Sequence, residues 1–417
     1  MTTLNNKKKD STRLSELLSL PLAQQRSRGY ADTLREILQQ PVTWVETAKL
    51  LADPVVREAL QPALSPPPAH IVLTGSGSSM YIGECLAPLL QRGLGVPVRA
   101  IAAGTLLTHW RDVLPPGGGL LISLARSGDS PESGAVVSRL LADAPDYRHL
   151  VLTCNADGRL ATEYLDEPRV SVLVLDDRTN DRSLVMTSSF TNLLLAGLGL
   201  AKQNENGAWL AAASSLANDV HALLDTSADA LAAMVGDEFS SVLYLGSGGA
   251  FGAAQESALK MLEMTAGAVV TRAETYLGLR HGPMSSVDRR TLVVAFLSSD
   301  PAVRAYEYDL LHELSRKQLG RTRVLVGTQI AAEVVGTDCL AVELPGQGDD
   351  DGGLMLLADV VVGQLLAFFR CLHLGQKPDT PSQGVLTRVV EGFTLHQDRS
   401  DQHRSNQGRP HQGREDA

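Results

Sequence analysis

Three charged side chains recur at regular intervals in a segment that follows a Gly-Ser-Gly-Gly loop. Glu256, Lys260 and Glu263 are four and three residues apart, which places them on one face of a helix. Apolar residues fill the positions between them, and buried charges are costly unless they are paired. The spacing therefore indicates either a buried acid–base group or an ordinary Glu256–Lys260 surface pair, which would contribute only about 0.3 kcal/mol.

Two loops rich in glycine and serine could bind an anion. The first, residues 75–79, follows an apolar run. The second begins at Arg126 and contains Ser127 and Ser130, with Pro131 next in the chain. Ser130 can cap a helix whose first residue is Pro131, and free N–H groups at a helix start suit a phosphate. The alternative for each loop is structural: a tight turn for the first, and a capped helix for the second.

His281 is the one histidine whose setting suggests chemistry. It lies in Gly278-Leu-Arg-His-Gly-Pro283, a sequence typical of a shaped loop, and an imidazole that titrates near neutrality can move a proton on a sugar ring oxygen. A solvated loop histidine is the alternative. The remaining histidines and the four cysteines show no metal-binding spacing, so neither a metal nor a cofactor is expected, and the cysteines are expected to be buried free thiols.

The elements that must position these residues form a repeated pattern. Ile71–Thr74 and Val242–Leu245 are apolar runs, each followed by a Gly/Ser loop and a helical pattern, about 170 residues apart. Further apolar runs follow each of them. They lie at 96–102, 120–124, 150–153, 170–175, 292–297, 323–326 and 340–344. Strands that alternate with helices predict an α/β fold with parallel sheets covered on both faces and ligands at the carboxyl ends of the strands.

The same pattern suggests the domain organisation. Residues 1–68 form a helical lead-in, 69–203 a first domain with the phosphate loops, and 208–376 a second domain with the catalytic helix and the histidine loop. Residues 377–396 form a C-terminal substrate loop, and 397–417 a disordered tail. The apolar stretch 354–374 contains Asp359, Gln364 and Arg370, which favours a buried helix over a membrane span.

Charge and composition narrow the classes of partner. The 417 residues carry a formal charge of −10, and aromatic residues make up 4% of them. A strongly acidic protein repels a phosphate backbone, and few aromatics can stack on bases, so nucleic acid is not an expected partner. The basic start of the chain leads into no apolar signal segment. We therefore expect a cytoplasmic protein that binds neither membrane nor nucleic acid.

Taken together, these motifs resemble the two-domain sugar isomerase (SIS) family over roughly residues 45–395. Residues 127–130 and 77–79 are similar to its two phosphate loops. Residues 256–263 and 279–283 resemble the catalytic helix and loop of the isomerase half of glucosamine-6-phosphate synthase. One departure is Ala125, which stands where the commonest phosphate loop has a serine, so the pose of the phosphate is less defined than its presence. The resemblance implies two tandem SIS domains, each a parallel five-stranded sheet flanked by helices in a flavodoxin-like three-layer sandwich.

Within this family the chain resembles the stand-alone branch of galactosamine-6-phosphate deaminases and tagatose-6-phosphate ketose/aldose isomerases. Residues 125–132, 273–283 and 378–392 are similar to that branch. The first cysteine, Cys85, lies inside the first domain, so we expect no glutaminase domain of the kind that supplies ammonia for amino-sugar synthesis. Deamination of galactosamine 6-phosphate is therefore the favoured hypothesis.

The resemblance also implies roles for individual residues. Glu263 would move a proton between C2 and C1, Lys260 would stabilise the developing charge beside Glu256, and His281, from a partner subunit, would assist ring opening. The 6-phosphate and the sugar would be held by Ser78, Ser79, Arg126, Ser127, Ser130 and Arg388. A homodimer or a dimer of dimers with shared sites follows. Two alternatives stay open: a non-deaminating aldose–ketose isomerase and a non-catalytic sugar-phosphate-sensing module.

Overall fold

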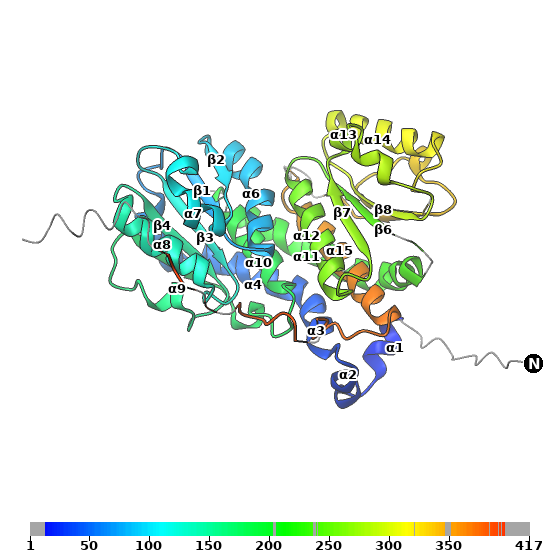
Figure 1. Ribbon diagram of the computed structural model, residues 1–417, viewed down its shortest axis with the longest axis horizontal. Helices are drawn as coiled ribbons and strands as arrows, with labels where there is room; N and C mark the ends of the chain where they lie inside the picture. The colour runs from blue at the N-terminus through cyan, green and yellow to red at the C-terminus, as the bar shows by residue number, and fades with distance from the viewer. Residues whose placement is uncertain are drawn as a thin grey trace, which may run out of the picture.

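Two similar α/β lobes lie side by side in the computed structural model (Figure 1). It describes residues 13–202, 206–236, 239, 241–320, 322–346, 352–382, 384–390, 392 and 394–396. Each lobe has a five-stranded parallel sheet, ordered β2-β1-β3-β4-β5 in the first and β10-β9-β8-β6-β7 in the second. Read from the opposite edge, the second order is the same as the first. This is the flavodoxin-like order, and it confirms the predicted fold class and the duplication.

The first sheet follows the predicted apolar runs closely. Its central strands are buried on both faces, as expected when helices cover both sides of a parallel sheet. Its strands are β1 (Ile71–Thr74), β2 (Val98–Ala100), β3 (Leu120–Ala125), β4 (Arg148–Thr153) and β5 (Val170–Val174). Its helices are α6 (Ser78–Leu94), α7 (Ala103–Val113), α8 (Pro131–Asp143), α9 (Arg159–Thr162), the 3-10 helix η1 (Asp177–Thr179) and α10 (Ser188–Leu200).

The second lobe contains one strand that the sequence did not predict. β7 (Val270–Glu274) is a half-exposed edge strand of sequence Val-Thr-Arg-Ala-Glu, so it lacks the apolar run of a central strand. The other strands are β6 (Ser241–Leu245), β8 (Thr291–Phe296), β9 (Arg323–Gly327) and β10 (Cys339–Glu343). The helices are α11 (Asn206–Gly236), α12 (Gly249–Met264), α13 (Tyr276–Leu279), η2 (Pro283–Ser286), α14 (Pro301–Arg316), η3 (Ala332–Val334) and α15 (Met355–His373).

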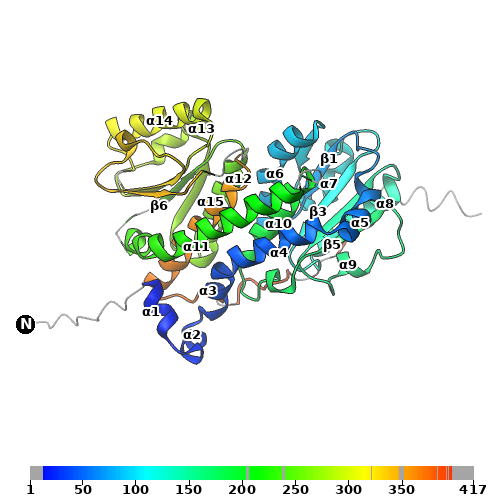
Figure 2. The same cartoon turned by 180° about the vertical axis from the view of Figure 1, so that it is seen from behind.

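The N-terminal helices are α1 (Leu14–Ser19), α2 (Leu22–Arg28), α3 (Ala31–Leu38), α4 (Gln40–Ala52) and α5 (Pro54–Leu64). Of these helices, α3 and α4 lie where the two lobes meet, whereas α5 packs against the first sheet (Figure 2). α4 packs against α10 and α11, and its Trp44 is fully buried, with the indole N–H donating to Thr191 Oγ1 at 2.9 Å. α4 therefore belongs to the core that joins the two lobes.

One continuous apolar core extends across both lobes, and two smaller clusters lie on the outer faces of the sheets. α15 runs through the large core. It is long and apolar enough to cross a membrane, yet 94% of its most apolar window is buried inside this fold. Gln364 on α15 accepts a hydrogen bond from Gln40 at 2.8 Å and donates to the Thr187 carbonyl at 3.2 Å. The prediction of a buried helix is confirmed.

The cysteines are all free, as expected. Cys85, Cys154 and Cys371 are buried, whereas Cys339 is only partly buried. Residues 397–417, for which the sequence predicts a disordered tail, lie outside the described residues.

Candidate active site

The Gly/Ser loop after β1 (residues 75–79) and the Gly/Ser loop after β6 (residues 246–249) have the same backbone conformation. Gly77 and Gly248 adopt φ values of 56° and 55°, each with ψ −127°, and each residue immediately precedes a helix. A positive φ at this position favours glycine. The loops therefore turn each chain from the end of β1 or β6 directly into α6 or α12. In the first lobe this turn lies at the topological switch point of the sheet, between β1 and β3, where ligands bind in this class of fold.

A cavity of about 140 Å³ lies at this switch point, and we call it the anion pocket. It brings together both predicted phosphate loops and the C-terminal segment, which are far apart in the sequence. Its lining is Ser76, Ser79, Leu124, Ala125, Arg126, Ser127, Gly128, Ser130, Glu132, Ser133, Met186, Arg388, Val389 and Val390. Five of the six residues predicted to bind the substrate thus share one pocket, and the sixth, Ser78, is the neighbour of Ser79.

The start of α8 differs in one detail from the prediction. Ser130 is the N-cap residue and Pro131 the first helical residue, as expected, but the Ser130 side chain makes no capping hydrogen bond. Its hydroxyl instead donates to Glu132 Oε2 at 2.6 Å. Ser130 thus occupies the predicted N-cap position, but its hydroxyl binds Glu132 rather than a backbone N–H of α8. Gly128, with φ of 73°, makes the turn that brings Ser127 and Ser130 to the pocket.

Arg126 holds the wall of the pocket together. It is 8% exposed, and its Nη1 donates to the Leu184 carbonyl at 2.9 Å and the Ser183 carbonyl at 3.4 Å. Its Nη2 donates to the Arg388 carbonyl at 2.5 Å. The side chain of Arg388 donates in turn to the Asp181 carbonyl at 2.6 Å. Two cations thus face the pocket, both fixed by the loop that follows η1.

The charged residues of α12 form a buried group. Glu256 and Lys260 are 0% and 1% exposed, so the surface-pair hypothesis is wrong. Lys260 Nζ lies 3.3 Å from Glu256 Oε1, 2.5 Å from Glu263 Oε2 and 3.0 Å from Ser78 Oγ. The ammonium is therefore shared between two carboxylates and a hydroxyl of the first lobe.

Burial sets the electrostatics of this group. It raises the pKa of Glu256, and the nearby Lys260 cation opposes this shift and favours the carboxylate. For Lys260, burial alone would lower the pKa, but the carboxylates of Glu256 and Glu263 outweigh it and raise the pKa above its ordinary value. Lys260 therefore remains a cation at neutral pH. Glu263 is the most open of the three, with its side chain 24% exposed, so it can reach a ligand.

The hydrogen bond from Lys260 to Ser78 connects this group to the anion pocket. Ser78 and the pocket residue Ser79 form the first turn of α6. This connection requires α6 and α12 to lie very close. A Cβ atom at Gly252 of α12 would be 2.6 Å from the backbone nitrogen of Cys85 on α6, so only glycine fits there.

Two residues near the charged group were not predicted. Tyr81 and Glu84 lie on α6. Burial raises the pKa of Tyr81, and Glu256 and Glu263 raise it further. Burial also raises the pKa of Glu84. Tyr81 lies three residues after Ser78, and Glu84 lies three residues after Tyr81, so the three share one face of α6. This spacing is the signal that could have identified them.

His281 lies apart from these groups. It is exposed on the loop between α13 and η2, and its main-chain N–H donates to the Gly278 carbonyl at 3.0 Å. Within the described part of the chain it neither lines the anion pocket nor makes an ion pair with the α12 carboxylates. The same part of the chain contains no group of three or more His, Cys, Asp or Glu residues placed to hold a metal ion.

Sequence comparison identifies close relatives of this arrangement. D-galactosamine-6-phosphate deaminase AgaS of Escherichia coli is 35% identical over 372 residues, covering 87% of this chain and 95% of the relative. A Streptomyces coelicolor protein that shares the AgaS name is 40% identical over 378 residues, with the same coverage. The chain belongs to the AgaS family. No model of a protein family matches it.

Solved structures agree with this assignment. Tagatose-6-phosphate ketose/aldose isomerase from Escherichia coli is 32% identical and superimposes with a TM-score of 0.78, covering 88% of this chain and 96% of that one. The C-terminal domain of glucosamine-fructose-6-phosphate aminotransferase from Francisella tularensis gives a TM-score of 0.67 at 20% identity, with 84% and 98% coverage. The latter shows the fold alone. This AgaS-family chain therefore has the tandem SIS architecture that its motifs suggested.

Proposed function

We propose that this chain converts D-galactosamine 6-phosphate and water into D-tagatose 6-phosphate and ammonia by proton transfer between C2 and C1. The observation that carries the proposal is the Lys260–Ser78 hydrogen bond of 3.0 Å. It connects a carboxylate–ammonium group on α12 to the α6 turn that lines an anion pocket. The names of the AgaS relatives and of the Escherichia coli isomerase support this choice of substrate class.

In this proposal the anion pocket binds the 6-phosphate. The hydroxyls of Ser79 and Ser127 donate to its oxygens, and that of Ser130 would turn from Glu132 Oε2 to do the same. Arg126 and Arg388 supply positive charge beside it. Binding of the phosphate end fixes the position of the reactive end of the opened sugar. Such positioning can supply a large part of the decrease in activation free energy, because the reacting groups are already held together. C1 and C2 would then lie beside Glu263.

Glu263 acts as the base. It removes the proton from C2 of the open-chain aldehyde, giving an enaminol, and returns a proton to C1, which leaves a C1 alcohol and a C2 imine. Lys260, held as a cation, stabilises the charge that develops on O1. Glu256 pairs with Lys260 on its buried side at 3.3 Å and so orients it. Water then adds to the C2 imine, and ammonia leaves.

We propose that His281 assists ring opening in a neighbouring subunit, in a dimer or a dimer of dimers with shared sites. Its exposure on one chain supports this role. Leu262, Val270 and Leu277 on α12, β7 and α13 are also exposed, by 45%, 60% and 48%, which suits an apolar contact between subunits. Mixing Glu263→Gln with His281→Asn protein tests it. Each hybrid dimer has one intact site of two, so an equimolar mixture, in which about half of the dimers are hybrids, should regain about a quarter of the wild-type activity. No recovery would place His281 in its own chain's site, and full activity of His281→Asn alone would place it outside any site.

An ammonia-release assay on galactosamine and glucosamine 6-phosphates tests the reaction. Ammonia from the galacto epimer is the expected result. Interconversion of tagatose 6-phosphate with an aldose phosphate, without deamination, would instead identify a simple isomerase. Binding of these sugars without turnover would indicate a sensing module and contradict the proposal. We place this soluble enzyme in the cytoplasm, where sugar phosphates are metabolised.

A further inference from the structure

We propose that Glu36 on α3 is a positioning residue that sets the two arginines of the anion pocket. This inference deepens the proposed function, because it concerns how the same pocket holds an anion. Glu36 is 1% exposed, although it lies in the N-terminal helices outside both sheets. A buried carboxylate is costly unless it is well hydrogen-bonded, so its partners indicate what it does.

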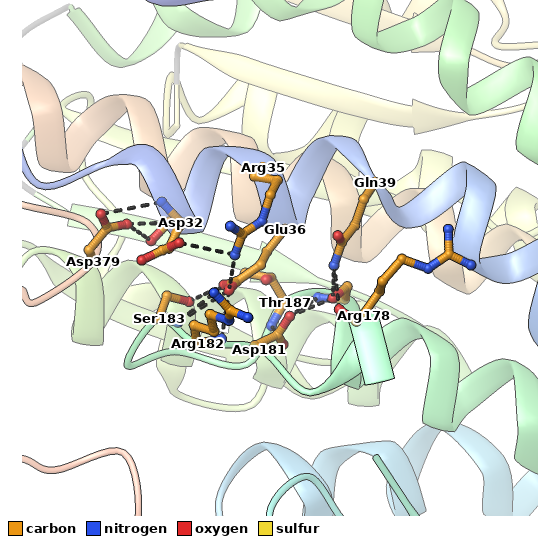
Figure 3. A network of polar contacts seen from close by, with 12 residues as sticks. Asp32, Arg35, Glu36, Gln39, Arg178, Asp181, Arg182, Ser183, Thr187 and Asp379 are labelled. Carbon is orange, nitrogen blue, oxygen red and sulfur yellow. Dashed lines mark hydrogen bonds and ion pairs between the residues drawn. The ribbon is translucent and has the colours of Figure 1, made fainter. Parts of the chain in front are cut away.

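Glu36 binds the loop that follows η1 (Figure 3). Its Oε1 accepts from the backbone N–H of Arg182 at 2.6 Å and that of Ser183 at 3.3 Å. Its Oε2 accepts from the Ser183 hydroxyl at 2.5 Å. Arg35 Nη2 approaches Oε1 at 3.3 Å. Both oxygens are thus used to fix two consecutive residues of the loop, 146 and 147 positions away in the sequence.

The opposite side of this loop holds the pocket arginines. The carbonyls of Ser183 and Leu184 accept from Arg126 Nη1, and the Asp181 carbonyl accepts from Arg388 Nε. Ser183 therefore donates hydrogen bonds to Glu36 through its N–H and hydroxyl, and its carbonyl accepts one from Arg126. A displacement of this residue would move both arginines relative to the serines of the pocket.

The start of the same helix fixes the C-terminal segment. Asp379 Oδ1 accepts from the backbone N–H and the hydroxyl of Thr33, each at 2.8 Å. The Asp379 carbonyl accepts from the Leu184 N–H at 3.3 Å. α3 thus connects the loop after η1 with the segment that carries Arg388, and Glu36 is the charged centre of that connection.

The protonation of Glu36 should change how firmly the loop is held. Burial, and then the neighbouring Asp181 carboxylate, raise its pKa to about 7, against the opposing hydrogen bonds of Ser183 and Arg182. The charged groups around it come from four segments of the chain. They are Arg35 and Asp32 on α3, Asp181 and Arg182 on the loop, Arg126 after β3 and Asp379 in the C-terminal segment. The carboxylate form of Glu36 accepts stronger hydrogen bonds than the acid form, so it should hold the loop more firmly. We therefore expect Arg126 and Arg388 to be best positioned above pH 7, where Glu36 is ionised.

Direct repulsion between an ionised Glu36 and a bound anion would have the opposite effect, because it would weaken binding as the pH rises. The sign of the pH dependence therefore separates a positioning role from a simple charge effect. Sulfate is a suitable probe because it stays a dianion between about pH 6 and 8, and none of the described residues that line the pocket is a histidine.

Equilibrium dialysis of the full chain with radiolabelled sulfate tests the inference at about pH 6 and pH 8. We expect wild-type sulfate affinity to be several-fold higher at pH 8, and Glu36→Gln to bind about fivefold to tenfold more weakly there, with no pH dependence. Glu58→Gln, which changes an exposed glutamate on helix α5, should behave like wild type. For the sugar phosphate, Glu36→Gln should raise KM more than it lowers kcat.

Two results would overturn the inference. One is a Glu36→Gln protein that melts at a lower temperature but binds sulfate with wild-type affinity and pH dependence, which would make Glu36 purely structural. The other is wild-type affinity that falls as the pH rises. Because sulfate binding requires no turnover, an enzyme that released no ammonia from any hexosamine phosphate would contradict the proposed function and leave this measurement intact.

Discussion

The two lobes differ in the space between the loop after their first strand and the loop after their central strand. This space is an open pocket in the first lobe, whereas in the second lobe a buried carboxylate binds both loops. In the first lobe the anion pocket lies between residues 75–79 and 125–130. In the second, Glu307 of α14 accepts from the Ser298 N–H at 2.8 Å and from the Ser247 hydroxyl. Glu307 is 1% exposed, and its counterpart on α8, counted from Pro131 and Pro301, is the apolar Val137.

The helices that follow the Gly/Ser loops, α6 and α12, differ in the opposite sense, because only α12 carries the buried charged group. Counted from Gly77 and Gly248, the positions of Glu256, Lys260 and Glu263 on α12 correspond to Cys85, Leu89 and Arg92 on α6. The first lobe thus has an open anion site and no acid–base group, and the second has an acid–base group and a filled anion site. Under the proposed function, the duplicated scaffold would divide anion binding and proton transfer between its two copies.

Replacing Lys260 tests this division most severely. Lys260→Met removes the cation that connects the two lobes, and we expect kcat to fall by about 10²–10³-fold, since one preorganised charge donor is lost. Sulfate binding in the first lobe should change little. Leu89→Met, the same change to methionine at the corresponding position of α6, should keep nearly full activity. Equal loss in both variants, by steady-state kinetics, would contradict the division.

The close contact between α6 and α12 should matter next. Gly252→Ala places a methyl group 2.6 Å from the Cys85 backbone nitrogen, so the helices must separate. We expect about 1–3 kcal/mol lower stability and about 10–100-fold lower kcat/KM, because Ser78 and Lys260 move apart. Gly104→Ala on α7, where a Cβ meets nothing within 4 Å, is the control for chemical denaturation and kinetics. An active, stable Gly252→Ala protein would refute the required spacing.

Glu307, which occupies the space in the second lobe that corresponds to the anion pocket, should contribute to stability but not to catalysis. Glu307→Leu leaves the Ser298 N–H and the Ser247 hydroxyl without their acceptor, so unfolding should cost about 1–3 kcal/mol less. Asp309→Leu, at an exposed position of the same helix, should shift stability by only about 0.5 kcal/mol. Both should keep kcat within about twofold of wild type. A large loss of activity in Glu307→Leu alone would give the second site a catalytic part.

The fold was largely predictable because parallel central strands are apolar on both faces and stand out in the sequence. β7 was missed because an edge strand carries no such run. The spacing of Glu256, Lys260 and Glu263 identified a shared helix face, but not its burial, which depends on α6 and α15 packing over it.

Long-range contacts set the limit of prediction within the site. The pocket residues Ser79, Ser127 and Arg388 were identified from loop motifs and from the family resemblance. Nothing in the local sequence indicated Glu36, because its partners lie 146 residues or more away and act through main-chain groups. His281 lies apart from the anion pocket and the α12 group in the described part of the chain, and its proposed role involves a second subunit.

The central claim is that the Glu263 carboxylate moves the proton between C2 and C1 beside an anion held by the first lobe. Its most direct test follows, by NMR, the loss of deuterium from galactosamine 6-phosphate labelled at C2, in wild type and Glu263→Gln. We predict that the variant binds sulfate with wild-type affinity but loses the label about 10²–10⁴-fold more slowly. Wild-type loss of the label in a correctly folded Glu263→Gln protein would contradict the account.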